Sequence, residues 1–332
     1  MDNKNIWYIS TERSPLQRDF YRIGINGKNK KRLSTADGTW SVSASAGCKY
    51  YVANYSTIST PTVSTLHKGD GTLVRVLEDN AALRETIKEI NMPLKELFTF
   101  TTPEGYTLNG FMTRPADFDP NKKYPVLMTQ YSGPGSQEVT DSWFVSWEDA
   151  LVQEGYIVAC VDPRGTGYRG EEFTKLSYGI MGRLETEDQI SAAKYLATLP
   201  YVDAERIGIY GWSYGGYMAL NCILKGADGF KSAISVAPVT SWRYYDSVYT
   251  ERFMRTPQEN GDNYEKTAAI NRAPNLNGSL LLMHGMADDN VHVRNSMEYA
   301  EALVQADKQF DMHFYTNRNH SIYGGNTRYH IF

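Results

Sequence analysis

Residues 206–216 read RIGIYGWSYGG, a pattern typical of a strand that turns sharply into a helix. The turn matches Gly-x-Ser-x-Gly, which needs Gly211 and Gly215 because the strained backbone of the central serine leaves no room for side chains two residues away. Apolar residues precede the turn, and apolar residues at helical spacing follow it. The pattern therefore predicts that Ser213 is a nucleophile at a strand end. The alternative is a buried serine in a glycine-rich turn.

The overall composition argues against several classes of protein. The 332 residues are 41% hydrophobic with a net charge of -4, enough for one large core and a smaller one. The basic cluster at 28–32 lies among turn residues, so we expect no nucleic-acid partner. No apolar stretch approaches the roughly 20 residues of a membrane span, and none is expected. Cys48, Cys160 and Cys222 lack Cys-x-x-Cys spacing, so we expect core cysteines, no metal and no cofactor.

The first 78 residues predict short antiparallel strands, because apolar alternation is interrupted by turn residues. A few such strands cannot bury both faces alone, so we expect residues 1–78 to be the remnant of a β-propeller, one or more partial blades. Residues 79–95 predict a connecting helix. The strands are expected at 6–9, 20–23, 50–55 and 62–66.

From residue 96 to residue 332, strands alternate with helices. This order predicts an α/β-hydrolase fold, a mostly parallel sheet of about eight strands with helices on both faces. Ligands bind such sheets at the carboxyl ends of the strands, where Ser213 falls. The predicted strands are 97–102, 107–113, 126–130, 157–161, 207–210, 231–236, 280–283 and 312–315, and the predicted helices are 143–153, 185–199, 214–225 and 293–306.

A serine nucleophile needs a base, and the base needs an acid that orients it. In α/β hydrolases the acid and then the histidine follow the serine along the chain, each on a loop after a strand. Strand 280–283 leads into Asp288 and Asp289, and strand 312–315 leads into the loop that contains His320. We expect His320 to be the base. One aspartate is expected to orient it and the other to cap the next helix or contact its amides; spacing does not separate them.

The other five histidines fit other roles better. His284 ends a strand before a glycine and is expected to shape its loop through hydrogen bonds. His292 opens a helix near the acidic loop and is the second choice for the base. The remaining three lie within a strand, in the β-rich half and in the final helical stretch: His313, His67 and His330.

Acyl transfer also requires hydrogen-bond donors for the oxyanion. The backbone N–H of Tyr214 is expected to be the first donor, because it directly follows Ser213. Tyr131 follows strand 126–130, where this fold places a second donor, and each donor contributes on the order of 3 kcal/mol. The alternative for Tyr131 is an aromatic ring packed under a glycine loop.

Three long motifs occur in order along the chain: GWSYGGY at 211–217, WRYYDSVYTER at 242–252 and HGMADDNVH at 284–292. On these motifs the chain resembles the dipeptidyl peptidase IV group of the prolyl oligopeptidase family of serine peptidases, in its C-terminal catalytic portion. The resemblance extends from residue 6 to the end. It implies that Ser213 is the nucleophile, that Asp288 and not Asp289 is the acid, and that His320 is the base.

The resemblance also implies how a substrate is bound. It gives the Tyr131 hydroxyl the oxyanion role and lets Asn290 contact the carbonyl before the scissile bond. From the residues alone, 242–249 would be an aromatic helix face in a core; the resemblance makes it part of a pocket for the residue before the cut. A flat aromatic box suits proline. The implied pocket residues are Tyr214, Val239, Trp242, Tyr245, Tyr249 and Val291.

The activity implied by the resemblance is that of a serine exopeptidase that releases N-terminal dipeptides ending in proline or alanine. Members of the family hold the free amino group on a pair of propeller glutamates, and most of that propeller lies outside this chain. Glu171 and Glu172 align with a hydrolase loop and are not given this role. The alternatives are a tripeptidyl peptidase, an acylpeptide hydrolase or an esterase, or an inactive fragment that serves as an interaction module.

The resemblance further implies a homodimer, formed through residues 295–304 and the C-terminal helix. The sequence itself does not give the compartment. The family implies a periplasmic or cell-surface parent protein. We expect this chain to be the C-terminal part of a longer protein, because its first strands make an incomplete propeller and its last helix stops where relatives continue.

Overall fold

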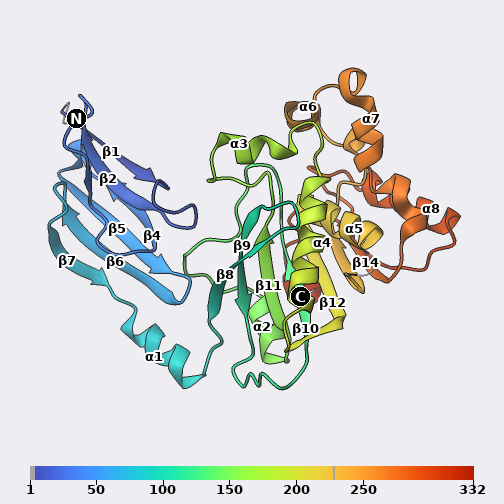
Figure 1. Ribbon diagram of the computed structural model, residues 1–332, viewed down its shortest axis with the longest axis horizontal. Coiled ribbons are helices and arrows are strands. Elements are labelled where there is room, and N and C mark those ends of the chain that lie inside the picture. The colour runs from blue at the N-terminus through green and yellow to red at the C-terminus, as the bar shows by residue number, and fades with distance from the viewer. Residues whose placement is uncertain (1–3, 227–228) are drawn as a thin grey trace. The chain divides into compact units, whose positions relative to one another are not determined.

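The computed structural model describes residues 4–226 and 229–332, which form two compact units. One unit contains the residues up to Leu97 together with Val139–Asp149, and the other contains Phe98–Glu138 and Ala150–Phe332. Figure 1 labels their helices and strands. Within the described ranges, no helix combines the length and the apolar character that crossing a membrane requires.

The N-terminal unit consists of two antiparallel sheets, and all four strands predicted there are present. The sequence does not predict β4, which is rich in small polar residues, or β7, which is exposed along its whole length. Strand β7 lacks the apolar alternation of a half-buried strand, whereas β4 has it, with Trp40 and Val42 on the inner face and Ser41 exposed, so its signal was present and was missed. The sheets are β1 (Asn5–Ser10), β2 (Asp19–Gly24) and β3 (Lys31–Arg32), and β4 (Thr39–Ala44), β5 (Tyr50–Thr57), β6 (Thr60–Lys68) and β7 (Leu73–Glu78).

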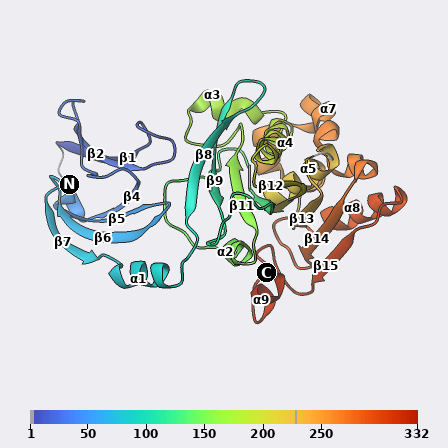
Figure 2. The ribbon, with the colours of Figure 1, turned by 60° about the horizontal axis from the view of Figure 1, so that its bottom comes forward.

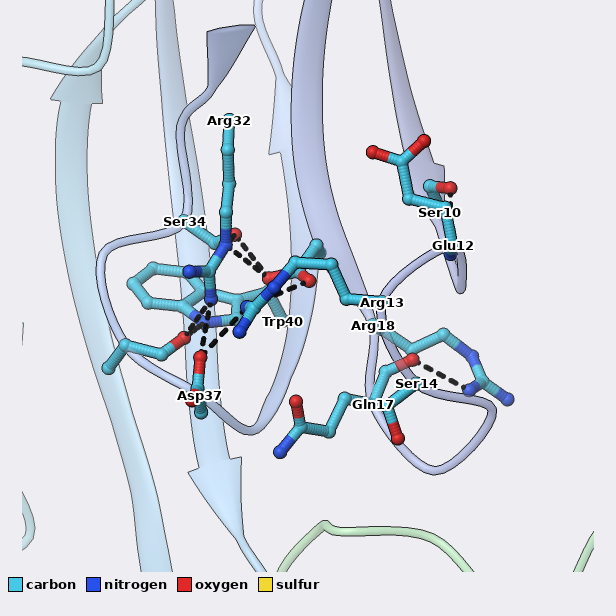
Figure 3. A network of polar contacts seen from close by, with 12 residues as sticks. Ser10, Glu12, Arg13, Ser14, Gln17, Arg18, Arg32, Ser34, Asp37 and Trp40 are labelled. Carbon is cyan, nitrogen blue, oxygen red and sulfur yellow. Dashed lines mark hydrogen bonds and ion pairs between the residues drawn. The ribbon is translucent and has the colours of Figure 1, made fainter.

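A network of polar contacts in this unit includes Arg32, which donates to Ser34 and to Asp37 (Figure 3). Asp19 accepts hydrogen bonds from Arg32 Nε at 2.7 Å and from Ser34 Oγ at 2.6 Å. Arg32 also donates to the carbonyl of Ala36 at 2.7 Å, so one guanidinium joins strand β2 to the loop after β3. The apolar core beside this network contains Phe20, Leu33, Trp40, Cys48, Tyr51 and Ala53.

The connecting helix α1 covers Ala81–Glu89 and is shorter than the predicted 79–95. It begins after Asn80, which has a left-handed φ of 55°. It ends at Ile90, whose N–H bonds to the carbonyl of Thr86. None of the residues of α1 is buried, so its apolar spacing does not form a core in this structure.

The C-terminal unit is built on an eight-stranded sheet in the order β15-β14-β13-β12-β10-β11-β9-β8. Neighbours from β15 to β11 pair in parallel, and β9 pairs antiparallel with β11. This arrangement confirms the predicted α/β-hydrolase fold. The strands are β8 (Lys95–Thr101), β9 (Thr107–Thr113), β10 (Tyr124–Thr129), β11 (Ile157–Asp162), β12 (Val202–Trp212), β13 (Ser232–Val236), β14 (Ser279–Gly285) and β15 (Asp311–Tyr315).

Helices cover both faces of this sheet. In Figure 2, α4 and α5 lie on one face and α2 lies on the other. Helix α5 is buried along nearly all of its length, in agreement with its mostly apolar sequence. The helices are α2 (Glu148–Gln153), α3 (Glu171–Thr174), α4 (Leu184–Ala197), α5 (Tyr214–Lys225), α6 (Ser247–Met254), α7 (Pro257–Thr267), α8 (Arg294–Gln305) and α9 (Thr327–Ile331).

Two predictions about helices were wrong or incomplete. The helix predicted at 143–153 covers only its second half, because the Asp149 carboxylate accepts the N–H of Ser146 at 2.8 Å and the helix starts just after this cap. Helices α6 and α7 were not predicted. Helix α7 nevertheless carries a readable signal, a capping box between Thr256 and Glu259 with Pro257 at its first position.

Candidate active site

Ser213 lies in a strained turn between β12 and α5. Its φ of 61° and ψ of -117° fall outside the regions that residues with a side chain normally adopt. Its N–H is fixed by a 2.8 Å hydrogen bond to the carbonyl of Val236, at the end of the neighbouring strand β13. The strain is therefore held by the sheet, and the half-buried Ser213 side chain stands at the carboxyl end of β12.

The two flanking glycines are required by close backbone contacts. A Cβ on Gly211 would lie 2.1 Å from the carbonyl oxygen of Gly215, and a Cβ on Gly215 would lie 2.5 Å from that of Gln130. Both neighbours are backbone atoms that cannot rotate away. The Gly-x-Ser-x-Gly pattern thus has the steric basis that the sequence predicts.

The loop after β14 presents the buried carboxylate of Asp288. Its Oδ1 accepts the N–H groups of Asn290 and Val291, each at 2.9 Å. Its Oδ2 lies 2.7 Å from His320 Nδ1 and 3.2 Å from His284 Nε2. Although burial opposes ionisation, the hydrogen bonds with His284 and His320 hold the pKa of Asp288 well below its usual range. An ionised acid is therefore fixed against one ring nitrogen of His320.

The neighbouring Asp289 is exposed. The expected cap is not formed, because α8 begins after Val293 with no side-chain cap, and the amides that Asp288 accepts belong to the loop before this helix.

The loop after β15 holds His320 in contact with two other segments. Its ring is 18% exposed and meets Asp288, while its carbonyl accepts the indole N–H of Trp212 at 2.9 Å. Trp212 directly precedes Ser213, so this bond ties the histidine loop to the strained turn. The N–H of Ala287 also donates to the carbonyl of Arg318 at 2.9 Å, which joins the histidine loop to the acidic loop.

The remaining histidines lie elsewhere or are engaged. His284 is fully buried, with Nδ1 2.7 Å from Ser296 Oγ and Nε2 2.8 Å from the carbonyl of Val291, so it shapes its loop as predicted. His292 is exposed and accepts the N–H of Arg294. The other three pack against aromatic rings. His67 stacks on Tyr51, His313 packs against Tyr315, and His330 lies beside both His313 and Tyr315.

Tyr131 begins the loop after β10 and reaches the serine. Burial raises the pKa of its hydroxyl, and a hydrogen bond with the Ser213 side chain acts in the opposite direction. The ring is accommodated because residue 133 is glycine: a Cβ there would lie 2.6 Å from Tyr131 Cε1. The Tyr131 hydroxyl, the Ser213 side chain and the N–H of Tyr214 thus belong to one site.

A narrow aromatic pocket opens beside Ser213. The Trp242 ring lies 5.5 Å from the Tyr214 ring and stacks 6.1 Å from that of Tyr249, and Tyr245 meets Tyr249 edge to face at 5.5 Å. The lining residues are Tyr131, Ser213, Tyr214, Val239, Trp242, Tyr245 and Tyr249.

Two further residues expected to bind substrate lie next to this pocket. Asn290 accepts a 2.6 Å hydrogen bond from the Tyr245 hydroxyl through Oδ1. An amide whose oxygen is occupied keeps its N–H₂ group as a donor. Val291 is fully buried and donates its backbone N–H to Asp288. Its side chain is not among the described residues that line the pocket.

One residue of the site has no recognisable signal in the sequence. Glu185, in the first turn of α4, is fully buried and accepts a 2.8 Å hydrogen bond from the Tyr214 hydroxyl. Acidic residues are common in the first turn of helices, where they are usually exposed. Glu171 and Glu172, by contrast, lie in the short helix α3, where Glu171 pairs with Lys175.

Comparisons with known proteins agree with this geometry. Residues 143–332 match the prolyl oligopeptidase family, and residues 1–62 match the dipeptidyl peptidase IV (DPP IV) N-terminal region. The "Probable dipeptidyl-aminopeptidase B" of Metarhizium robertsii is 38% identical over an alignment that covers 97% of this chain and 36% of the relative. The "Probable dipeptidyl-aminopeptidase B" of Pyrenophora tritici-repentis is 40% identical over an alignment that covers 97% of this chain and 38% of the relative.

A solved structure is more similar still. The crystal structure of Porphyromonas gingivalis dipeptidyl peptidase 4 is 51% identical, superposes with a TM-score of 0.95 and covers 98% of this chain. This chain covers 46% of that protein and little more than a third of the curated relatives. The strained serine turn, the buried aspartate-histidine contact and the match over residues 143–332 lead to one assignment. The chain belongs to the prolyl oligopeptidase family.

Proposed function

We propose that the protein containing this chain is a serine exopeptidase that releases dipeptides ending in proline, or less readily alanine, from the N-termini of peptides. The observation that carries the proposal is the 2.7 Å contact between Asp288 Oδ2 and His320 Nδ1 at the sheet edge where Ser213 is held in its strained turn. The names of the relatives, dipeptidyl-aminopeptidase B and dipeptidyl peptidase 4, support the same activity.

The first half of the reaction is acylation of the serine. Ser213 Oγ attacks the carbonyl carbon of the scissile bond while His320 Nε2 takes its proton. Asp288 stabilises the resulting imidazolium from the opposite ring nitrogen. The Tyr214 N–H and the Tyr131 hydroxyl donate to the oxyanion, each contributing on the order of 3 kcal/mol. Collapse of the tetrahedral intermediate breaks the C–N bond, and His320 gives the proton to the leaving amine.

The second half releases the dipeptide. A water molecule attacks the ester carbon of the acylated Ser213, and His320 accepts one of its protons. The second tetrahedral intermediate then breaks its bond to Ser213 Oγ, and the proton held by His320 returns to that oxygen. The products are the dipeptide carboxylate and the free serine, so the site regains its starting state.

The pocket supports the preference for proline. Its small size and its aromatic walls fit a compact apolar ring. A long or charged side chain would have to displace rings packed 5.5 to 6.1 Å from one another. The Nδ2 group of Asn290, whose Oδ1 is occupied by Tyr245, is suited to donate to the carbonyl before the scissile bond.

The proposal is tested by replacing the serine in the complete protein. Ser213→Ala should abolish cleavage of a Gly-Pro chromogenic substrate. The matched control is Ser191→Ala on α4, whose hydroxyl only bonds to the carbonyl of Glu187, and it should cleave normally. Undiminished cleavage by Ser213→Ala would exclude the mechanism. Substrates with one, two or three residues before the cut separate a dipeptidyl from a tripeptidyl peptidase, and blocked amino acids and simple esters test the acylpeptide hydrolase and esterase alternatives.

We also propose that the complete protein forms a homodimer through α8 and α9. Helix α8 buries Tyr299 and Leu303 against its own unit while Met297 and Val304 are about half exposed, which leaves apolar surface for a partner. Sedimentation of the complete protein tests this. Met297→Lys with Val304→Lys should shift a dimer towards the monomer, and an unchanged sedimentation coefficient would reject the surface.

A further inference from the structure

A buried carboxyl group lies behind the wall of the pocket. Glu185 is fully buried, its Oε1 accepts the hydroxyl of Tyr214 at 2.8 Å and its Oε2 accepts the N–H of Gly182 at 3.0 Å. Burial raises the pKa of Glu185 to about 7, although the hydrogen bonds from Gly182 and Tyr214 oppose the rise; the charge of Asp188 also disfavours ionisation. Such a group is unfavourable to bury, and the reaction described above does not use it directly.

Tyr214, the partner of Glu185, belongs to two parts of the proposed site. Its backbone N–H follows Ser213 and is the expected oxyanion donor, and its side chain lines the pocket. The ring is 2% exposed and lies 5.5 Å from Trp242 and 6.0 Å from Tyr131. The hydrogen bond between the Tyr214 hydroxyl and Glu185 therefore fixes the Tyr214 ring. This ring packs beside Trp242 and Tyr131, which also line the pocket.

The chain just before Glu185 supports the same pocket from a second side. We call residues Gly179–Glu185 the supporting segment. The N–H of Gly179 donates to the carbonyl of Phe253 at 2.7 Å, and the N–H of Met181 lies 3.3 Å from Met254 Sδ. Both partners belong to α6, the helix that carries Tyr249.

The supporting segment also contacts α5, the helix that follows Ser213. The Tyr217 hydroxyl lies 2.9 Å from the carbonyl of Met181. Gly182 has a φ of 81°, and a Cβ there would lie 2.0 Å from the Tyr217 hydroxyl, so the tyrosine can pack only on glycine. The supporting segment thus links α5 with α6. Among the hydrogen bonds described here, the one between Glu185 and Tyr214 is the one that joins this segment directly to a side chain lining the pocket.

We propose that Glu185 is a positioning residue that, through the Tyr214 hydroxyl, sets the width of the pocket and thereby its preference for proline over alanine. The inference rests on the proposed peptidase function. Without an acceptor, the buried Tyr214 hydroxyl loses its hydrogen bond and the ring is free to move within the aromatic cluster. A loosened wall loses contacts with a proline ring, whereas the smaller alanine side chain makes fewer contacts to lose.

The test uses Tyr214→Phe, Glu185→Leu and the double variant in the complete protein. Tyr214→Phe removes only the hydroxyl, and Glu185→Leu removes its acceptor while keeping a side chain that can be buried. The ratio of kcat/KM for Gly-Pro and Gly-Ala substrates should fall about tenfold in each single variant. The double variant should be no worse than the more affected single one, because both act through one bond. The control Glu187→Gln, in the same helix but 35% exposed, should keep the wild-type ratio.

Labelling by a fluorophosphonate separates failure of this inference from failure of the proposed function. An unlabelled, non-cleaving wild type overturns the proposed function. A wild type that is labelled and cleaves, with variants that keep its proline-to-alanine ratio, overturns the role of Glu185 alone. An equal loss for both substrates also overturns it, because a purely structural defect has that effect. If Glu185→Leu does not fold, the ratio measured for Tyr214→Phe decides.

Discussion

The buried ion pair between Arg164 and Asp188 gives the sharpest prediction about stability. Arg164 follows β11, and Asp188 lies in α4. The backbone N–H, Nε and a terminal nitrogen of Arg164 all donate to Asp188 over 2.7 to 3.0 Å. The two residues are 5% and 0% exposed, and the guanidinium lies 4.8 Å from the ring centroid of Tyr106. We therefore expect Asp188→Asn to leave a buried cation without a full counter-charge.

The magnitude follows from what remains around the guanidinium. Glu104 and Glu187 each lie 3.9 Å from it, but their side chains are 50% and 35% exposed, so solvent screens their charges. Breaking a buried pair by removing one partner destabilises a protein by about 3 to 5 kcal/mol. In a unit of this size each kcal/mol lowers Tm by about 2 to 4 °C, so a loss of about 10 °C is expected.

Thermal unfolding of wild type and Asp188→Asn, followed by calorimetry, measures this loss. The control Glu187→Gln removes a partly exposed neighbour from the same helix and should lower Tm by no more than about 2 °C. The double replacement Arg164→Met with Asp188→Asn removes both charges, keeps a side-chain oxygen for the backbone N–H of residue 164 and should recover most of the loss. A decrease below about 1 kcal/mol in Asp188→Asn, with an unchanged fold, would refute the reasoning, because the pair would then contribute no more than a surface one.

Three further predictions follow from the geometry. Gly211→Ala places a Cβ 2.1 Å from a backbone oxygen and should lose about 3 kcal/mol in urea unfolding, whereas Gly261→Ala, with no atom closer than 4.0 Å, should not. The pKa of Glu185 is raised from 4.5 to about 7, so folding favours its neutral form and wild type loses stability as the pH rises through this range. The stability of Glu185→Gln relative to wild type should therefore increase by roughly 2 to 3 kcal/mol between pH 5 and pH 8. Burial raises the pKa of the Cys222 thiol, and all three cysteines are buried, so a thiol reagent should react only after denaturant is added.

The parts of the fold that the sequence predicts are those specified by local chemistry. The turn around Ser213 is readable because two glycines, an apolar strand and an apolar helix lie within about twenty residues. The mostly parallel character of the sheet follows from the alternation of strands and helices, since parallel strands need crossover connections. The same local logic predicts that His320 and one of two aspartates follow the last strands.

The parts that escape prediction depend on contacts between distant residues. Spacing does not separate Asp288 from Asp289, because the difference is whether a carboxylate meets His320, 32 residues away. Glu185 reads as an ordinary first-turn acid, and only the fold brings Tyr214 to it. Strand β7 shows no alternation because every residue in it is exposed. Helix α7 is different, since its capping box at Thr256 is legible in the sequence.

The central claim is that Ser213 is the nucleophile of a charge-relay site, and the most direct measurement locates the adduct of a fluorophosphonate on the complete protein by mass spectrometry. We predict a single adduct on Ser213, formed at a rate that falls by orders of magnitude in Asp288→Asn because the orienting acid is lost. A folded protein that cleaves Gly-Pro substrates but carries the adduct on another residue would contradict the account.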